Sequence, residues 1–199
     1  MLRKRFIVTC LLSTALAIIF ALASAPISLG ANAPDPSACG IVSGDEAQKF
    51  VGGPLDVKES AKTPTNNGPD TYTSFCTYIA QGGDFNNAFG AARLLDLTLH
   101  FLHTSETMAQ IYENSVNQYF EAIRAPDVPL KDPAISMLQG FGDKAFVLEA
   151  VTDPKTGYKS ALIVFYKGKV GGSIAAWKKP EPALETTKTV LKHILSKLP

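Results

Sequence analysis

The clearest alternation of hydrophobic and polar positions in this chain is RLLDLTLHFL, residues 93–102. Successive side chains of a β-strand point to opposite faces of the sheet. The apolar residues of this segment therefore share one face: Leu95, Leu97, Leu99 and Phe101. The polar residues share the other face: Asp96, Thr98 and His100. We predict a strand whose apolar face is buried and whose polar face is at least partly exposed to solvent.

Four further segments have the composition of strands. YTSFCTYI at 72–79 is rich in aromatic and β-branched residues. Closer to the C-terminus, KAFVLEAV, YKSALIVFY and KVGGSIAAW are joined by the turn sequences DPKTG and KGK, which predicts a three-stranded β-meander. Gly171 and Gly172, in the last of these strands, indicate a bulge or the close approach of another element.

Helical periodicity appears in three places. Ser43 and Glu46 have the spacing of a capping box, and Gly52 provides a stop signal, so a short helix is expected between them. Apolar residues recur at helical spacing after Thr104 and again after Pro182. These two segments are predicted to be amphipathic helices.

The predicted element order is αββαβββα. Short links between consecutive strands favour antiparallel pairing, so the expected fold class is α+β, an antiparallel sheet of about five strands with helices packed on it. Segments rich in proline, glycine or asparagine at 63–70, 81–90 and 125–140 are expected to be loops. We find no internal repeat, and we expect a single domain over residues 34–199.

Residues 1–33 have the organisation of a secretory signal peptide. The basic segment MLRKR precedes an uncharged, largely apolar run from Phe6 to Ala23, and small residues follow. We expect cleavage between residues 23 and 33 and a secreted or periplasmic product. The apolar run is also long enough to leave open an uncleaved membrane anchor.

Two cysteines remain after removal of this segment, because Cys10 lies within it. In an oxidising compartment, Cys39 and Cys76 are expected to form a disulfide. Closing a loop of about 37 residues would stabilise the fold by about 4 kcal/mol, because it restricts the unfolded chain. A redox pair or a metal site fits less well, since the spacing is not C-x-x-C and no histidine cluster accompanies it.

The charge of the chain after residue 33 argues against nucleic acid as a partner. This part has 16 basic and 18 acidic residues, so its formal charge is −2. Proteins that bind nucleic acid concentrate basic residues on one face to contact phosphates. No comparable basic cluster is present in the sequence, so we expect no nucleic-acid binding.

Three short motifs together resemble a known pattern. They are Cys39 ahead of a helix that ends in glycines, Cys76 followed by an aromatic residue, and GFGDKAF at 140–146 leading into a hairpin. Over about residues 38–178 the chain resembles the uncharacterised two-cysteine lipoprotein-type domains of actinobacteria and the extracellular sensor domains of their membrane Ser/Thr kinases. The resemblance implies an envelope-facing, non-catalytic domain with a PsbP-like or related α+β fold. Many such proteins have a lipidation cysteine that this chain lacks, which argues against the same surface anchoring.

Motifs for metal binding or catalysis are weak. His100 and His103 are spaced as H-x-x-H, but on a strand they would point to opposite faces, and no third ligand accompanies them. GFGD at 140–143 is interpreted as a turn in which Asp143 accepts hydrogen bonds from local amides. His193 is expected to face solvent near the end of the C-terminal helix. We therefore expect no metal, no cofactor and no catalytic residue.

Loops supply the remaining candidates for a binding site. An aromatic residue in the glycine-rich segment 81–90 either folds back on the core or meets a partner. The segment 125–140 is long for a connection in a compact domain, which is typical of functional or disordered loops. We predict a ligand or partner site between these loops and the polar face of the strand at 93–102. Its predicted residues are Phe85, Phe89, Asp96, Thr98 and His100.

The sequence thus favours an exported, non-catalytic binding or interaction domain of the cell envelope or periplasm. Its partner would be an envelope component, a small ligand or a protein. Two alternatives stay open at this point: a secreted hydrolase-type enzyme with a site assembled only in three dimensions, and a structural envelope protein held by an uncleaved N-terminal helix. A cleft containing His100 or Asp143 with a strongly shifted pKa would favour the enzyme.

Overall fold

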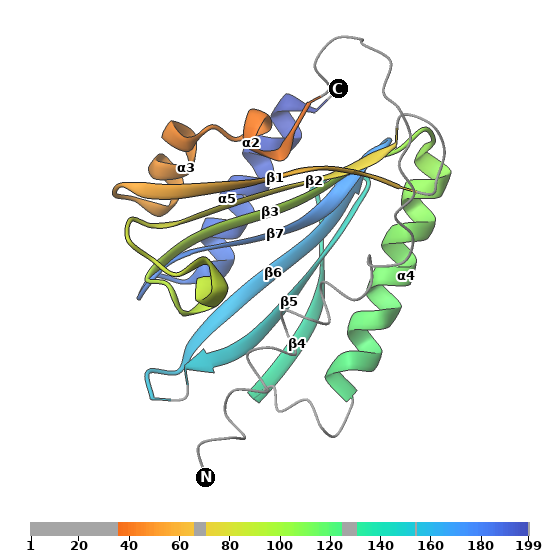
Figure 1. Cartoon of the computed structure of the whole chain (residues 1–199). Coiled ribbons are helices and arrows are strands. Elements are labelled where there is room, and N and C mark those ends of the chain that lie inside the picture. Colours follow the sequence, from red (N-terminus) through yellow and green to blue (C-terminus); the bar gives the residue numbers. More distant parts are fainter. Residues whose placement is uncertain (1–35, 66–70, 125–130, 154, 199) are drawn as a thin grey trace.

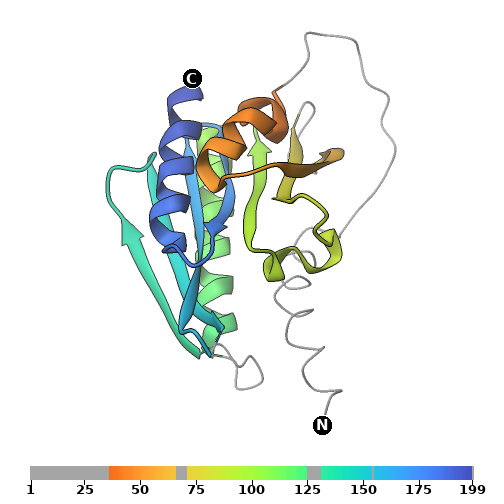
Figure 2. The same cartoon turned by 90° about the vertical axis from the view of Figure 1, so that its left-hand side faces the viewer.

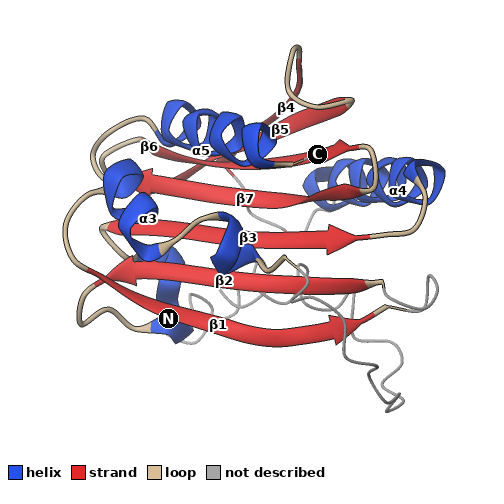
Figure 3. Ribbon diagram, turned by 90° about the horizontal axis from the view of Figure 1, so that it is seen from above, coloured by secondary structure: helices blue, strands red, loops and turns tan. Residues whose placement is uncertain are grey.

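A seven-stranded antiparallel sheet is the central element of the fold (Figure 3). The computed structural model describes residues 36–65, 71–124, 131–153 and 155–198, so the predicted signal segment lies outside the described residues. The strands are β1 (Leu55–Pro64), β2 (Tyr72–Ala80), β3 (Arg93–Phe101), β4 (Lys131–Leu138), β5 (Lys144–Asp153), β6 (Tyr158–Lys167) and β7 (Val170–Lys178). Their order is β1-β2-β3-β7-β6-β5-β4, so the β3–β7 pair joins the N-terminal strands to the C-terminal ones.

Helices cover both faces of this sheet. They are α2 (Ala38–Ile41), α3 (Gly44–Val51), α4 (Ser105–Arg124) and α5 (Ala183–Lys197), together with the short 3-10 helix η1 (Phe85–Gly90). Figures 1 and 2 show α2, α3 and α5 on one face, with α5 against β6 and β7, and α4 on the opposite face. None of the helices in the described ranges is long and apolar enough to cross a membrane.

Each face of the sheet has its own hydrophobic core. The main core lies under α2, α3 and α5 and contains the apolar face of β3 that the sequence predicted. In the second core, Met108 and Tyr112 of α4 pack against Phe146 and Tyr166 of the sheet. The α+β class is confirmed, and all five predicted strands are present, although the sheet has seven strands rather than five.

Strand β1 was not predicted from the sequence. Every residue of LDVKESAKTP is half-buried or exposed, so the segment has no alternation of apolar and polar residues to reveal it. It forms a strand because it pairs antiparallel with β2 from Leu55–Ala80 to Pro64–Tyr72. Its charged side chains suit an edge strand, because they discourage pairing with another chain.

Strand β4 corrects the prediction of a loop at 125–140. Lys131–Leu138 pairs with β5 at the other edge of the sheet, and residues 125–130 lie outside the described part. Pro133 falls between Lys131 and Ala134, where the register of the pairing shifts. A proline is tolerated there because an irregular edge does not require its missing N–H group. The predicted helix order also changes, since α2 precedes the capped helix and η1 lies within the predicted loop 81–90.

The predicted disulfide is present. Cys39 of α2 and Cys76 of β2 are bonded, with their Cα atoms 5.3 Å apart. The Cys76 side chain is fully buried in the main core. The bond therefore fixes α2 to the central region of β2. Disulfides are typical of proteins that function in oxidising compartments outside the cytosol.

The two glycines of β7 permit the close approach that the sequence predicted. A Cβ atom on Gly171 would lie 2.5 Å from Met108 Sδ of α4. A Cβ atom on Gly172 would lie 1.8 Å from the carbonyl oxygen of Thr98 on β3. Only glycine fits at positions where another element comes this close. The Gly171 contact places α4 on the same face of the sheet as His100, the cross-strand partner of Gly171.

The GFGD segment forms the turn between β4 and β5, as predicted. Gly142 has φ +69°, and a Cβ atom on it would lie 2.4 Å from the carbonyl oxygen of Tyr166. The carboxylate of Asp143 does not cap a local amide. Instead it accepts a hydrogen bond of 2.7 Å from the Gly168 N–H in the β6–β7 turn. The expected local role of Asp143 is therefore wrong, because the folded sheet brings a second turn next to it.

Candidate functional site

A pocket of about 300 Å³ lies over the β1–β3 half of the sheet. Three adjacent strands each contribute two side chains to its lining: Lys58 and Ser60, Phe75 and Thr77, Leu94 and Asp96. The face is the predicted polar face of β3, on the side of the sheet opposite α2, α3 and α5. The same face carries α4 over the C-terminal strands (Figure 1). The pocket is lined by β1–β3 and therefore lies on the other half of this face.

The strand pairing aligns three polar side chains across this pocket. Lys58 of β1 is the partner of Thr77 on β2, and Thr77 is the partner of Asp96 on β3. Directly paired residues of antiparallel strands point to the same face. Lys58 and Asp96 are thus separated by two strand spacings, about 10 Å between backbones, with Thr77 between them. They form no ion pair with each other.

Asp96 is a half-buried carboxyl group with a single hydrogen bond to another described side chain. Thr77 Oγ1 donates to Asp96 Oδ1 over 2.5 Å. Burial raises the pKa of Asp96 above its ordinary value, because removal from water disfavours the charged form, and the hydrogen bond from Thr77 only partly opposes this effect. A carboxyl group in this condition gains most from a ligand that offers a positive charge or a hydrogen-bond donor.

The 3-10 helix η1 forms the remaining wall of the pocket. Asp84 begins the helix by accepting a hydrogen bond of 2.8 Å from the Asn86 N–H. The side chain of Phe85 packs against the main core and also lines the pocket, and the Lys58 ammonium lies 5.8 Å from the centre of its ring. Asn86 and Asn87 add amide groups to the lining. Phe85 therefore folds back on the core and is still available to a ligand.

Two of the five predicted binding residues line this pocket, namely Phe85 and Asp96. The expectation that Thr98 and His100 face solvent is wrong, because only 8% and 6% of their surfaces are exposed. Nothing is described for the Phe89 side chain, which lies outside the described part of the structure. The alternation of apolar and polar residues in one strand shows which residues share a face, but it does not show what covers that face.

The contacts of His100 indicate a structural role in the sheet. Its Nδ1 lies 2.9 Å from the Thr73 hydroxyl of β2, and burial lowers its pKa to about 4. A neutral imidazole hydrogen-bonded to the adjacent strand contributes to the sheet. His100 does not line the pocket.

The sequence reasoning missed most of the lining. Phe75 and Thr77 could have been found, because they alternate with the buried Cys76 in the predicted strand and share a face with Asp96. Lys58 had no such signal, since β1 itself was not predicted. Asn86 and Asn87 lie in the segment that was singled out, and their amides were left out of the predicted site.

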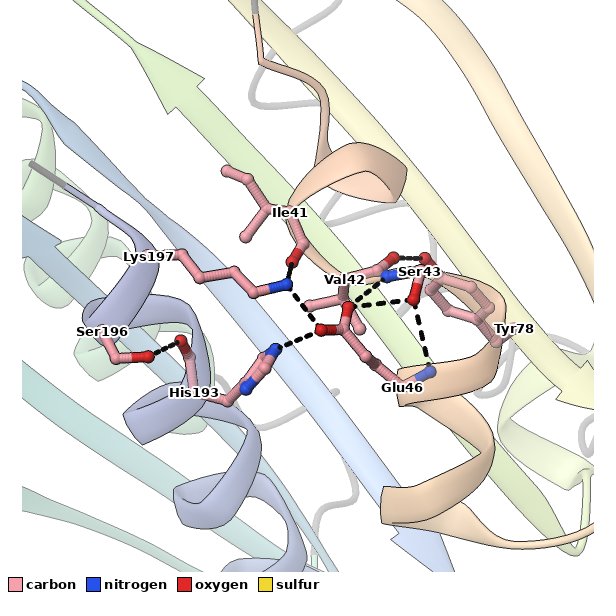
Figure 4. Close-up of polar contacts among 8 residues, drawn as sticks. All are labelled: Ile41, Val42, Ser43, Glu46, Tyr78, His193, Ser196 and Lys197. Atoms are coloured by element: carbon pink, nitrogen blue, oxygen red, sulfur yellow. Dashed lines mark hydrogen bonds and ion pairs between the residues drawn. The ribbon is translucent and has the colours of Figure 1, made fainter.

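A second polar cluster lies on the opposite face, between α3 and α5 (Figure 4). We call Ser43, Glu46, His193 and Lys197 the α3–α5 cluster. Glu46 Oε2 accepts from the Ser43 N–H at 2.8 Å, which completes the predicted capping box. Glu46 Oε1 lies 2.7 Å from Lys197 Nζ and 3.2 Å from His193 Nε2. Lys197 also donates to the carbonyl oxygen of Ile41 at 2.7 Å.

These contacts hold Glu46 in its charged form. Hydrogen bonds from Lys197 and from the Ser43 backbone lower its pKa from 4.5 to about 2, against the opposing effect of burial. The cluster joins the end of α5 to α2 and α3, and the Tyr78 hydroxyl of β2 donates to the carbonyl of Val42 beside it (Figure 4). Its polar groups are used in holding helices together.

The prediction that His193 faces solvent is wrong. Its side chain is 27% exposed, it contacts Glu46, and its ring lies 5.2 Å from that of Phe50 in an edge arrangement. The prediction failed because helical periodicity gave the position of His193 on α5 but could not show that α3 packs beside it.

The described residues contain no group of three or more histidine, cysteine, aspartate or glutamate side chains that could hold a metal ion. No family model matches the chain, and no curated protein matches it significantly. The pocket is therefore interpreted from its own geometry and chemistry.

Proposed function

We propose that this protein is an exported, non-catalytic binding domain of the cell envelope or periplasm, and that its pocket over β1–β3 holds a small ligand. The proposal rests on two charged side chains that line the pocket and have no ion pair within the described part of the chain. Lys58 and Asp96 line one pocket without pairing with each other, and neither has an ion pair among the described residues. Charged groups in a pocket that have no ion pair of their own are available to a ligand of opposite charge.

Export is supported by two independent features. The N-terminal segment has the organisation of a signal peptide, with basic residues ahead of an apolar run. The Cys39–Cys76 disulfide is typical of an oxidising compartment. The resemblance of the two-cysteine pattern to actinobacterial envelope domains agrees with this location.

The composition of the lining favours binding over catalysis. Acid–base hydrolysis of the glycosidase type uses a pair of carboxyl groups, and nucleophilic hydrolysis uses a nucleophile next to a base. Among the lining residues that the structure describes, Asp96 is the one acid, and none is histidine or cysteine. His100 is buried away from the pocket, and Asp143 is occupied in a turn. Neither of the two residues that would have favoured an enzyme lines this pocket.

The first test is the intact mass of the protein recovered from the envelope of its own host, measured under native and then denaturing conditions. We expect extra native mass that is lost on denaturation, and a denatured chain shortened by 23 to 33 residues. The denatured mass should rise by two hydrogens on reduction. A full-length chain with free thiols would contradict export and would support the structural protein held by an uncleaved helix.

A matched pair of substitutions connects that ligand to the pocket. Phe85 and Phe141 are both partly buried on the main core, and each has a lysine near its ring, at 5.8 Å and 5.7 Å. Only Phe85 lines the pocket. We expect Phe85→Ala and Phe141→Ala to lower the free energy of unfolding by similar amounts, about 1–2 kcal/mol for half-buried rings. Only Phe85→Ala should reduce the bound mass. Equal occupancy in both variants would exclude this pocket as the binding site.

A further inference from the structure

The pocket over β1–β3 is lined by one lysine and one aspartate on strands that lie two strand spacings apart. Lys58, Thr77 and Asp96 occupy the same cross-strand line, so the two charged side chains start from backbones about 10 Å apart. Asp96 is held towards β2 by its hydrogen bond from Thr77. The Lys58 ammonium lies over the ring of Phe85. Each side chain therefore has a contact with an uncharged neighbour, and the two charged groups do not pair with each other.

This charge arrangement discriminates between classes of ligand. A neutral ligand would remove water from both charges without compensating either of them, which is costly. An anion would compensate only Lys58, and a cation would compensate only Asp96. A ligand with a separated ammonium and carboxylate compensates both at once, and each new ion pair then carries hydrogen bonds as well.

The remaining lining defines the rest of the ligand. Phe75, Phe85 and Leu94 provide an apolar surface, and the amides of Asn86 and Asn87 can donate to and accept from a peptide group. A volume of about 300 Å³ is at the small end of the range for ligand pockets. The two ends of an extended dipeptide lie roughly 6–7 Å apart, which is within the separation of about 10 Å between the two backbones that carry the charged side chains.

We propose that the ligand is a short zwitterionic peptide with an apolar side chain, a dipeptide in the simplest case. Its ammonium group lies against Asp96, its carboxylate lies against Lys58, and its side chain packs on Phe75 and Phe85. This inference rests on the proposed binding function and specifies its ligand class. Asp96 has no ion pair among the residues that the structure describes, so its contact with an ammonium group gives the pocket a preference for ligands with a free N-terminus.

The test is a calorimetric binding series with the purified, disulfide-bonded protein. The probes are the dipeptide Leu-Phe, its N-acetyl form, its C-terminal amide, glucose and decanoate. We expect Leu-Phe to bind, and each blocked form to bind at least about tenfold more weakly, as loss of one ion pair requires. Equal binding of the free and blocked forms would overturn the proposal that the pocket recognises a zwitterionic ligand.

Two variants test which residue contacts each end of the ligand. In Lys58→Met, the acid and the amide of Leu-Phe should bind equally, because the group that distinguishes them is gone. In Asp96→Asn, the free and N-acetylated forms should bind equally. Lys192→Met, which removes the lysine over Phe141, is the control and should retain both preferences. Retention of either preference in the corresponding pocket variant would reject the assigned orientation.

The other probes separate this inference from the proposed function. Binding of glucose or decanoate in place of the dipeptide would reject the ligand class and leave the pocket as a binding site. Failure of every probe, together with no ligand mass on protein from the host, would reject the binding function itself.

Discussion

Glu46 and Asp96 are two partly buried carboxyl groups on opposite faces of the same sheet, and their environments shift their pKa values in opposite directions. Hydrogen bonds from Lys197 and Ser43 lower the pKa of Glu46 to about 2. Burial raises the pKa of Asp96, which has only Thr77 to offset it. In the α3–α5 cluster the charges are compensated within the molecule, whereas in the pocket they are not. The first arrangement stabilises the fold, and the second leaves binding energy for a ligand.

The largest expected effect concerns the cysteines, which hold α2 on the face of the α3–α5 cluster. Cys39→Ala or Cys76→Ala should lower the free energy of unfolding by about 4 kcal/mol, because the unfolded chain regains the entropy of a 37-residue loop. Urea denaturation of the two single variants and of the double variant checks this. The double variant should cost little more than either single one, and clearly additive losses would contradict a shared bond.

A smaller effect is expected from Glu46→Gln. Glutamine can retain the capping box, so the substitution isolates the charge. We expect a loss of about 1–2 kcal/mol at neutral pH, since the partly exposed position screens the ion pair with Lys197. The folded-state pKa is lowered, so the stabilisation is complete above the ordinary value of 4.5 and is lost as the pH falls towards 2. The stabilities of wild type and variant, measured by urea denaturation, should therefore converge over that pH range.

The smallest effect, with the opposite sign, is expected from Asp96→Asn. The pKa of Asp96 is raised by burial, so its carboxylate destabilises the folded state at neutral pH. Asparagine removes the charge and can still accept a hydrogen bond from Thr77. We expect the melting temperature to stay the same or rise slightly, with a gain of about 1 kcal/mol or less. A clear loss of stability, as in Glu46→Gln, would show that the two carboxyl groups have the same structural role and would break the comparison.

The parts of the fold that were predictable are those with a strong local signal. The alternation at 93–102 identified β3, the Ser43–Glu46 spacing identified the start of α3, and the pairing of the two cysteines followed from compartment and count. Strands β1 and β4 lacked such a signal, because edge strands are exposed and need no alternating pattern. Their pairing with β2 and β5 supplies the hydrogen bonds that define them.

The candidate site was predictable only in part for the same reason. Phe85 and Asp96 were named because an aromatic residue in a glycine-rich segment and a polar residue on a strand face are visible locally. Lys58 comes from an unpredicted strand, and it faces Asp96 only through the register of β1 on β2 and of β2 on β3. Thr98 and His100 were assigned to solvent because no local pattern reveals what covers a sheet face.

The sequence by itself determined the fold class, the capped helix α3, the disulfide partners and the residues that share each face of β3, because these depend on spacing along the chain and on the count of cysteines. The tertiary structure decided the rest. It placed α4 over one half of the pocket's face, compensated Glu46 with residues about 150 positions away in sequence, and left Lys58 and Asp96 unpaired across three strands. Whether a charge is compensated depends on neighbours brought together by packing, and that information is not local to any segment.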